Sequence, residues 1–223
     1  PISVPLPSFL AYRNWTGIID RPTALFVGTH EGLMHAFRVD RLDGDIAVQD
    51  YGEELWAFMP AHLLEKTSDL AFRMDYLMDG TPVVKDVRLY KTSANMDIAD
   101  ETDAWHSVLV SGYGSGGRGY FALDVTRPES MGFMWELSNT RLSFNIPGQS
   151  EGAIDTSSYT RLGKTVSQQV IGSAFWNHYG VLGERAVVIY GGGASVDGAT
   201  DSGKAVCVVD LETGTLAQEV CYG

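Results

Sequence analysis

The pentapeptide at 148–152 has the spacing of a catalytic serine. Its sequence, GQSEG, fits the G-x-S-x-G pattern, in which a strained strand-to-helix turn exposes a nucleophilic serine, here Ser150. His178 and several aspartates downstream could complete a hydrolase site. Pro147 precedes the motif, however, and no helical pattern follows it. We therefore favour a loop of small residues over a hydrolase.

A second stretch, Gly114 to Gly119, satisfies the G-x-G-x-x-G pattern of dinucleotide sites. Such a site needs a helix after the glycines, because the helix N-terminus faces the pyrophosphate. Here the apolar run Tyr120 to Val125 follows, which is typical of a strand. The glycines therefore predict a hairpin turn. Gly163-Lys164-Thr165 also fails as a phosphate loop, because Ser158 stands where the leading glycine belongs.

Two groups of acidic residues could offer carboxylate oxygens to calcium. Neither group has the spacing of a known calcium loop, and each lies in a polar insert, where solvated surface charge is the alternative interpretation. The first group is Asp97, Asp100, Glu101 and Asp103, and the second is Asp197 and Asp201. We treat both groups as candidate metal ligands.

The charge of the 223-residue chain limits its partners. Sixteen Lys plus Arg stand against 28 Asp plus Glu, which gives a formal net charge of −12. Nucleic acid and anionic membranes need a basic surface, so neither is expected as a partner. No apolar run approaches the ~20 residues that a membrane-spanning helix needs.

The two cysteines, Cys207 and Cys221, form neither a disulfide scaffold nor a zinc signature. They fall on the two arms of a hairpin that turns at Glu212-Thr213, and the expected register sets Cys207 opposite Gln218 rather than Cys221. A bond between the cysteines would then need a bulge or splayed strands, whereas export from the cytoplasm would favour oxidation. The sequence leaves both redox states open.

Short runs rich in β-branched, aromatic and aliphatic residues recur along the chain and predict strands. The opening residues PISVPLPSF also predict a strand, and only Ala61 to Leu70 shows helical spacing. The expected strands lie within 23–39 (two strands around a turn at His30-Glu31-Gly32), 52–58, 81–90, 107–110, 120–125, 133–137, 170–176, 185–190, 205–210 and 215–220.

The strand pattern repeats at a fixed interval. Arg38, Asp124 and Asp210 end similar tetrapeptides and follow one another at intervals of 86 residues. Each copy holds about four strand-like runs, which indicates a β-propeller blade, although blades usually recur every ~40–50 residues and these must carry long inserts. The alternative is a β-sandwich with fortuitous spacing. We predict an all-β fold of about three four-stranded antiparallel blades.

The blade-like repeats cover about residues 1–70, 71–140 and 166–223, and a long loop covers 138–165. Trp56 and Trp135 are expected to pack between adjacent blades rather than to touch a ligand, because each blade must bury its faces against its neighbours. Since propellers need ~4–8 blades to close, we expect these residues to form part of a larger propeller.

Several segments of the chain match one known family in the same order. The most recognisable is VLVSGYGSGGRGYFALDVT at 108–126, which Trp105-His106 precedes and Trp135-Glu136 follows. LFVGTHEGLMHAF, GEELWAFMP, DGTPVVKDV and GKAVCVVDLETGTL resemble the same family's first-blade, blade-closing, second-blade and third-blade segments. The family is that of the PilY-type proteins of bacterial type IV pili, and the resemblance covers most of the chain.

The resemblance implies a quinoprotein-like β-propeller with a non-enzymatic role and no cofactor in this segment. The family comprises tip-associated adhesins and biogenesis factors that support pilus assembly, oppose retraction and contact surfaces. For this chain the resemblance implies export to the cell surface or pilus tip, and contacts with minor pilins and with host or abiotic surfaces. It also implies calcium in the full-length protein, through an acidic D-x-D-x-N loop beyond Gly223.

Other functional classes stay open beside this one. A quinoprotein-like oxidoreductase is suggested by fold analogy alone, since the adjacent cysteines expected for quinone dehydrogenases are missing. A serine hydrolase would use Ser150. A pure scaffold that docks minor pilins by edge-strand pairing differs from an adhesin only in its partner. We predict that the protein is not an enzyme.

Overall fold

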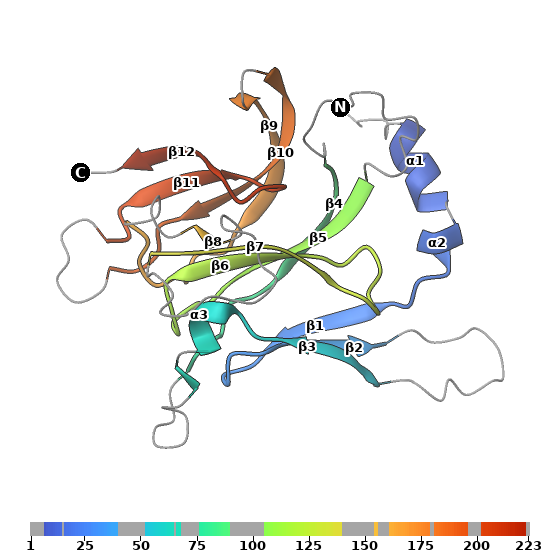
Figure 1. The fold of residues 1–223 in the computed structure, drawn as a ribbon, viewed down its shortest axis with the longest axis horizontal. Helices are drawn as coiled ribbons and strands as arrows, with labels where there is room; N and C mark the ends of the chain where they lie inside the picture. The colour runs from blue at the N-terminus through green and yellow to red at the C-terminus, as the bar shows by residue number, and fades with distance from the viewer. Residues whose placement is uncertain are drawn as a thin grey trace.

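The computed structural model describes residues 7–14, 16–39, 52–64, 66–67, 76–89, 105–139, 154–155, 161–178, 181–195 and 202–221. Within these ranges the chain forms three β-sheets and a few short helices (Figure 1). The sheets follow one another in chain order, and we call them blades 1, 2 and 3. This arrangement confirms the predicted all-β class.

Blade 1 has three antiparallel strands in the order β1-β2-β3. They are β1 (Ala24–Gly28), β2 (Met34–Arg38) and β3 (Glu54–Phe58). Gly32 closes the turn between β1 and β2, where its N–H donates to the Thr29 carbonyl at 2.9 Å and its φ of +93° suits a glycine. The hairpin is as predicted, but the described residues supply no fourth strand to this blade.

Blade 2 has five strands in sequential order. They are β4 (Val83–Arg88), β5 (Trp105–Gly112), β6 (Gly119–Asp124), β7 (Gly132–Ser138) and β8 (Ile154–Asp155). The first four pair antiparallel, whereas β8 pairs parallel with β7 at Glu136 and Leu137. β8 lies inside the segment that the sequence predicted to be a loop, because two residues without periodicity carry no strand signal.

Blade 3 has four antiparallel strands in the order β12-β11-β10-β9. They are β9 (Val170–His178), β10 (Val181–Gly191), β11 (Ala205–Asp210) and β12 (Leu216–Cys221). β10 pairs with β9 from Val181 to Ile189 and with β11 from Val187 to Gly191. The β9–β10 ladder therefore extends past the end of the β10–β11 ladder (Figure 1).

The three blades share one local irregularity. The register shifts between Ala36 and Phe37 in β2, between Ala122 and Leu123 in β6, and between Val208 and Val209 in β11, each time against the following strand. These bulges recur at the interval of 86 residues found in the sequence. One extra residue therefore bends every blade at the same place. The repeat is therefore structural.

The bulge in blade 3 changes the relation between the two cysteines. Cys207 lies opposite Glu219, and Cys221 lies opposite Ala205. The predicted register, with Gln218 opposite Cys207, was wrong by one residue, because the bulge adds Ala217 to β12 without a partner on β11. Diagonal neighbours of this kind lie ~7–8 Å apart, beyond the roughly 4.4–6.8 Å between the Cα atoms of a disulfide. The observed register disfavours a bond.

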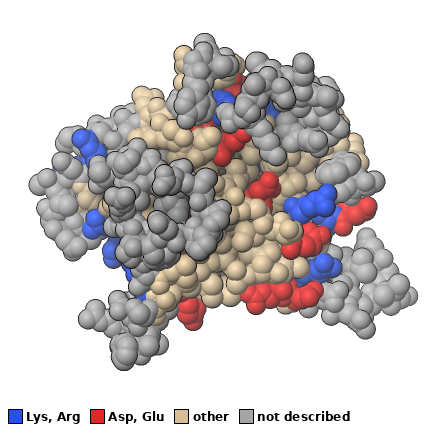
Figure 2. All heavy atoms as spheres, viewed as in Figure 1, with Lys and Arg blue, Asp and Glu red and all other residues tan. Residues whose placement is uncertain are grey.

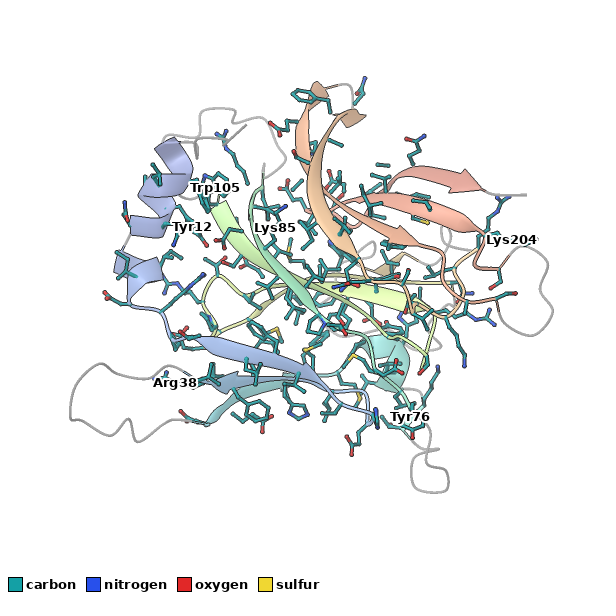
Figure 3. All side chains as sticks on the ribbon, turned by 180° about the vertical axis from the view of Figure 1, so that it is seen from behind. Tyr12, Arg38, Tyr76, Lys85, Trp105 and Lys204 are labelled. Atoms are coloured by element: carbon teal, nitrogen blue, oxygen red, sulfur yellow. The ribbon has the colours of Figure 1, made fainter. Side chains whose placement is uncertain are left out.

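A helix forms over residues 7–9, which the sequence predicted to be part of a strand, and residues 1–6 of that prediction lie outside the described part of the chain. Helix α1 spans Pro7–Asn14 and α2 spans Thr16–Ile19. Tyr12 of α1 is buried, and the rings of Phe9 and Trp105 lie 4.8 Å apart between α1 and β5. Figure 3 shows Tyr12 and Trp105 beside each other, with Lys85 of β4 nearby. Packing against Trp105 overrides the local strand pattern.

The predicted helix at 61–70 begins as expected and is short. Helix α3 spans Ala61–Leu64, and the structure does not describe 68–75. Ala61, His62 and Leu63 are buried. The helix therefore lies inside the molecule, at the connection from blade 1 to blade 2.

Two apolar layers hold the blades together, one at each junction. Blades 1 and 2 meet around Met34, Leu63, Leu77, Met78, Leu109, Tyr113, Phe121, Leu123 and Val125. Blades 2 and 3 meet around a larger group that includes Val108, Val110, Tyr120, Trp135, Ile171, Val188, Cys207 and Val209. Alternate residues of β5 face opposite blades, as the period of two in a strand requires.

Candidate functional site

The polar side chains of the described residues gather at the blade junctions. At the inner edge of the sheets, β4 and β9 touch, and Lys85 Nζ donates to the Ile171 carbonyl at 2.9 Å. A cavity of about 210 Å³ lies beside this contact and is lined by Lys85, Arg88, Trp105, Glu184 and Arg185, among others. Its volume is below the roughly 300–1,000 Å³ of typical ligand sites.

The charges around this cavity are engaged within the protein. Arg185 Nε donates to Asp210 Oδ2 at 3.0 Å and its Nη2 to Glu212 Oε2 at 3.2 Å. Glu184 accepts from Ser173 Oγ at 2.7 Å. These ion pairs orient the ends of β10 and β11, and they bring no nucleophile and base together.

A second hollow, of about 520 Å³, lies between blades 1 and 2. Its walls are mixed, with Ile18, Phe26 and Val84 among the apolar side chains, and its polar corner holds Arg21, Lys85, Asp86 and Ser107. This volume falls within the range of ligand sites. We call it the blade 1–2 groove.

The polar corner of the blade 1–2 groove resembles part of a catalytic site but lacks a base. Ser107 Oγ donates to Asp86 Oδ1 at 2.5 Å and accepts from Arg21 Nη1 at 2.8 Å. The hydroxyl of Tyr12 lies 3.1 Å from the same oxygen, and burial raises the pKa of Tyr12. His106, the adjacent histidine in the chain, pairs instead with Asp124 at 2.7 Å. Ser107 therefore joins α1 and β4 to β5 and is not activated as a nucleophile.

A buried carboxylate, Glu136 of β7, accepts hydrogen bonds from two structural elements. Its side chain is 1% exposed. Oε2 accepts from the Ala61 N–H at 2.8 Å, and Oε1 accepts from the His62 N–H at 3.0 Å and from His62 Nδ1 at 2.6 Å. The Tyr113 hydroxyl also donates to Oε1. Glu136 thus joins blade 2 to α3 through three hydrogen bonds, and the fourth, from Tyr113, lies within blade 2.

The environment of Glu136 determines its ionisation. Burial alone would raise the pKa of Glu136, but the hydrogen bond and charge of His62 and the Tyr113 hydroxyl outweigh burial and lower that pKa. Burial and the charge of Glu136 raise the pKa of Tyr113 well above its usual value, so the phenol keeps the proton that it donates. The signal for this cluster in the sequence is a lone charge inside the apolar run FMWEL.

Two tryptophans join neighbouring blades, as predicted. Trp56 Nε1 of blade 1 donates to the Pro128 carbonyl in blade 2 at 2.6 Å, and Trp135 Nε1 of blade 2 donates to the Leu211 carbonyl in blade 3 at 2.8 Å. The two indoles occupy the same place in their blades, opposite Ala36 and Ala122 at the bulges. Each tryptophan therefore packs between two blades, as predicted, and its N–H is used within the protein.

The glycine-rich run at 114–119 forms the buried turn between β5 and β6. Thr165 Oγ1 accepts from the Gly114 N–H at 3.1 Å and donates to the Gly119 carbonyl at 3.0 Å. A Cβ on Gly116 would lie 2.1 Å from the Leu77 carbonyl oxygen. The turn is packed against other backbone segments and followed by strand β6, so it offers no phosphate site.

The remaining predicted site residues lie outside the described part of the chain. This applies to Ser150 and to both acidic groups, Asp97, Asp100, Glu101 and Asp103 and Asp197 and Asp201. His178 ends β9, and its side chain is not described. Among the side chains that are described, no three His, Cys, Asp or Glu are placed to hold a metal ion. The hydrolase and calcium predictions are therefore untested by the structure.

The surface of the described residues carries mixed charge. In Figure 2, several Asp and Glu side chains lie along the lower edge, where Figure 1 shows blade 1. Lys and Arg side chains are scattered across the molecule in the same view. None of the helices in the described ranges is long and apolar enough to cross a membrane.

Comparison with known proteins gives consistent relatives. The Type IV pilus biogenesis factor PilY1 of Pseudomonas aeruginosa (strain UCBPP-PA14) is 29% identical over 206 residues, covering 90% of this chain and 14% of the relative. A PilY1 homolog of Xylella fastidiosa (strain Temecula1) is 29% identical over 202 residues, covering 89% of this chain and 13% of the relative. The chain thus spans about a seventh of the length of these relatives.

A solved structure and a family model extend the likeness to the fold. The crystal structure of the P. aeruginosa PilY1 C-terminal domain matches with a TM-score of 0.57 and 25% identity, covering 91% of this chain and 30% of that one. The family model described as the PilY1 beta-propeller domain matches residues 11–221. With that match across all three blades, the chain belongs to the PilY1 β-propeller family.

Proposed function

We propose that this chain is a propeller segment of a type IV pilus biogenesis factor and acts as a non-enzymatic interaction scaffold in the pilus machinery. The proposal is carried by the match to the PilY1 β-propeller family over residues 11–221. Relatives named type IV pilus biogenesis factor support the pilus role. Because those relatives are much longer, the assembly activity is a proposal for the protein that carries this segment.

The geometry of the described residues supports a scaffold over an enzyme. Ser107 is held by Asp86 and Arg21, and Glu136 is held by His62 and Tyr113. These two polar groups, both in the described part of the chain, join one structural element to another. Ser150 lies outside the described part of the chain, so its chemistry is tested separately.

We further propose that the segment is exported, lies at the pilus tip or cell surface, and contacts minor pilins as well as host or abiotic surfaces. In an affinity experiment, the immobilised 223-residue chain is expected to retain minor pilins from sheared pili. A Glu129→Gln variant, which changes an exposed carboxylate outside the blade junctions, is the matched control and should retain as much as the unchanged chain. Retention on bare surfaces or host cells without pilins would favour an adhesin. Retention of neither would overturn the proposed function.

The enzyme alternatives predict labelling or turnover that the scaffold does not. We expect no reaction of Ser150 with a fluorophosphonate probe, and no dye reduction when quinone and calcium are added. Ser150→Ala controls for labelling elsewhere on the chain. Labelling that this variant abolishes would instead assign hydrolase chemistry, and quinone-dependent dye reduction would assign an oxidoreductase.

Calcium binding in the acidic inserts remains a proposal. Asp97, Asp100, Asp103, Asp197 and Asp201 offer the hard oxygen ligands that calcium takes. Titration calorimetry of the chain with calcium is the direct measurement.

A further inference from the structure

Methionine is concentrated at one of the two blade junctions. Five of the seven methionines lie in the described part of the chain. Four of these five, Met34, Met59, Met78 and Met131, belong to the apolar layer between blades 1 and 2, which we call the blade 1–2 layer. Met134 is the one described methionine at the layer between blades 2 and 3. The two junctions therefore differ in their chemistry.

The residues around the methionines differ between the two layers as well. In the blade 1–2 layer, the methionines pack among six aromatic side chains, which are Phe26, Trp56, Phe58, Tyr113, Phe121 and Phe133. The layer between blades 2 and 3 consists mostly of aliphatic residues. A thioether packs favourably against aromatic rings, but it is also a side chain that oxidants convert to a sulfoxide. The blade 1–2 layer thus depends on groups that can be chemically changed.

Two of the four methionines are sealed inside the blade 1–2 layer. Met34 of β2 and Met78 are both 0% exposed. Their methyl groups meet against β1, since a Cβ on Gly28 would lie 3.5 Å from Met78 Cε and 3.8 Å from Met34 Cε. An oxidant therefore reaches these two sulfur atoms only when the junction opens.

The other two methionines lie at the margin of the same layer. Met59 and Met131 are partly buried and pack against its buried residues. Met59 follows Phe58, which lies opposite Met34 in the β2–β3 ladder, and Met131 immediately precedes β7. Their partial exposure leaves these side chains within reach of a small oxidant while the fold is closed.

We propose that Met59 and Met131 are modification sites for a hydroperoxide, and that their oxidation opens the blade 1–2 junction and exposes Met34 and Met78. In each step the sulfur lone pair attacks one peroxide oxygen, the O–O bond breaks and an S–O bond forms. With hydrogen peroxide, the sulfur loses two electrons, and the proton of the transferred OH passes to the departing oxygen, which leaves as water. This inference rests on the packing of the layer and holds independently of the pilus role.

The polarity of the sulfoxide explains why the layer opens. A sulfoxide oxygen is a hydrogen-bond acceptor, and burying it without a donor is unfavourable. Among the described side chains of the blade 1–2 layer, Tyr113 and Trp56 carry the donors. The Tyr113 hydroxyl already donates to Glu136, and Trp56 Nε1 already donates to the Pro128 carbonyl. The oxidised side chains therefore turn toward water and leave their places in the layer.

The order of oxidation in the whole 223-residue chain tests the proposal. Hydrogen peroxide is added under conditions in which the chain stays folded, and the sulfoxide at each methionine is followed over time by peptide mass spectrometry. Met59 and Met131 should oxidise at least ~10-fold faster than Met34 and Met78. The buried pair should react only after a lag, once the first two sulfoxides have formed.

A double variant, Met59→Leu with Met131→Leu, tests whether the outer pair controls the inner pair. Leucine keeps a similar apolar volume and forms no sulfoxide, so Met34 and Met78 should oxidise about 10-fold more slowly than in the unchanged chain. Met134→Leu is the matched control, because Met134 is also partly buried but packs at the other junction. It should leave the rates at Met34 and Met78 unchanged.

A second measurement needs no variant and does not depend on how the double variant folds. Methionine sulfoxide reductases that act on both sulfoxide epimers are added after Met59 and Met131 have reacted and before the buried pair has. On renewed addition of peroxide, the lag before oxidation of Met34 and Met78 should return.

Four results would overturn the proposal. Oxidation confined to Met59 and Met131 would mean that these residues react as surface groups without opening the junction. Equal rates at all four methionines would mean that the layer does not protect the inner pair. Equal protection of the inner pair by Met134→Leu and by the double variant would mean that the effect is not specific to the blade 1–2 layer. A lag that does not return after reduction would mean that the outer sulfoxides do not hold the junction open.

Discussion

Replacing Glu136 with alanine is expected to lower the free energy of unfolding by about 3–5 kcal/mol, the range found when one partner of a buried charged pair is removed. The carboxylate accepts from two backbone N–H groups at the start of α3, from the His62 ring and from Tyr113. Its removal leaves four buried donors without their acceptor, and each carries a desolvation cost. Glu136→Gln should cost nearly as much, because its amide NH2 group faces donors.

Urea unfolding followed by circular dichroism measures this loss, provided that the transition is two-state. Glu129→Gln is the control, because Glu129 is exposed, and it should change the free energy of unfolding by less than about 0.5 kcal/mol. A Glu136→Gln variant as stable as this control would contradict the structural role of the carboxylate.

The same cluster predicts how stability depends on pH. The pKa of Glu136 is lower in the folded chain than in the unfolded chain, where a glutamate titrates near ~4.3. The folded state therefore gains stability from the ionised carboxylate above that pH and loses it as the pH falls through the folded pKa. Glu136→Gln lacks this titration. The difference in unfolding free energy between the wild type and Glu136→Gln should consequently shrink as the pH falls below about 5.

Replacing Trp135 with alanine is expected to cost about 3–5 kcal/mol, as for other large-to-small substitutions of buried aromatic residues. The indole is buried between blades 2 and 3, and its N–H donates to the Leu211 carbonyl. Gly214 packs against the ring so closely that a Cβ there would lie 2.7 Å from the Trp135 Cγ. The neighbouring backbone cannot collapse into the space left by the ring without disturbing the β11–β12 turn.

Two further variants, Trp135→Phe and Trp56→Ala, separate the contribution of the Trp135 hydrogen bond from that of ring burial. The phenylalanine keeps most of the ring contact and loses the hydrogen bond, so it should cost about 1–2 kcal/mol. Trp56 holds the equivalent place in blade 1 but is only partly buried, so Trp56→Ala should cost less than Trp135→Ala. Equal losses for the two alanine variants in urea unfolding would show that burial of the indole does not determine its contribution.

Local patterns predicted the parts of the fold that local physics determines. Strand runs, the hairpin turn at Gly32 and the interval of 86 residues follow from side-chain preferences and glycine geometry, and the structure confirms them. The same reasoning predicted the roles of Trp56 and Trp135, because indoles at the ends of strands must be buried somewhere.

The features that the sequence did not predict depend on contacts between residues far apart in the chain. Helix α1 depends on Trp105, which lies 93 residues beyond Tyr12 in the chain. The Glu136 cluster joins residues 74 and 75 positions apart, and no periodicity marks such a pairing. The register of Cys207 changed because a bulge carries no sequence signature of its own. The predicted chemistry at Ser150 depends on residues that the structure does not describe.

Two adjacent residues of β7 contact the two different blade junctions. Trp135 and Glu136 point to opposite faces of blade 2, so one contacts blade 3 and the other contacts α3 at the end of blade 1. Repeat proteins can unravel one unit at a time when each interface is independent of the next. Here two interfaces depend on neighbouring residues of one strand, so an opening of β7 releases both. We therefore expect the three blades to unfold in one cooperative transition.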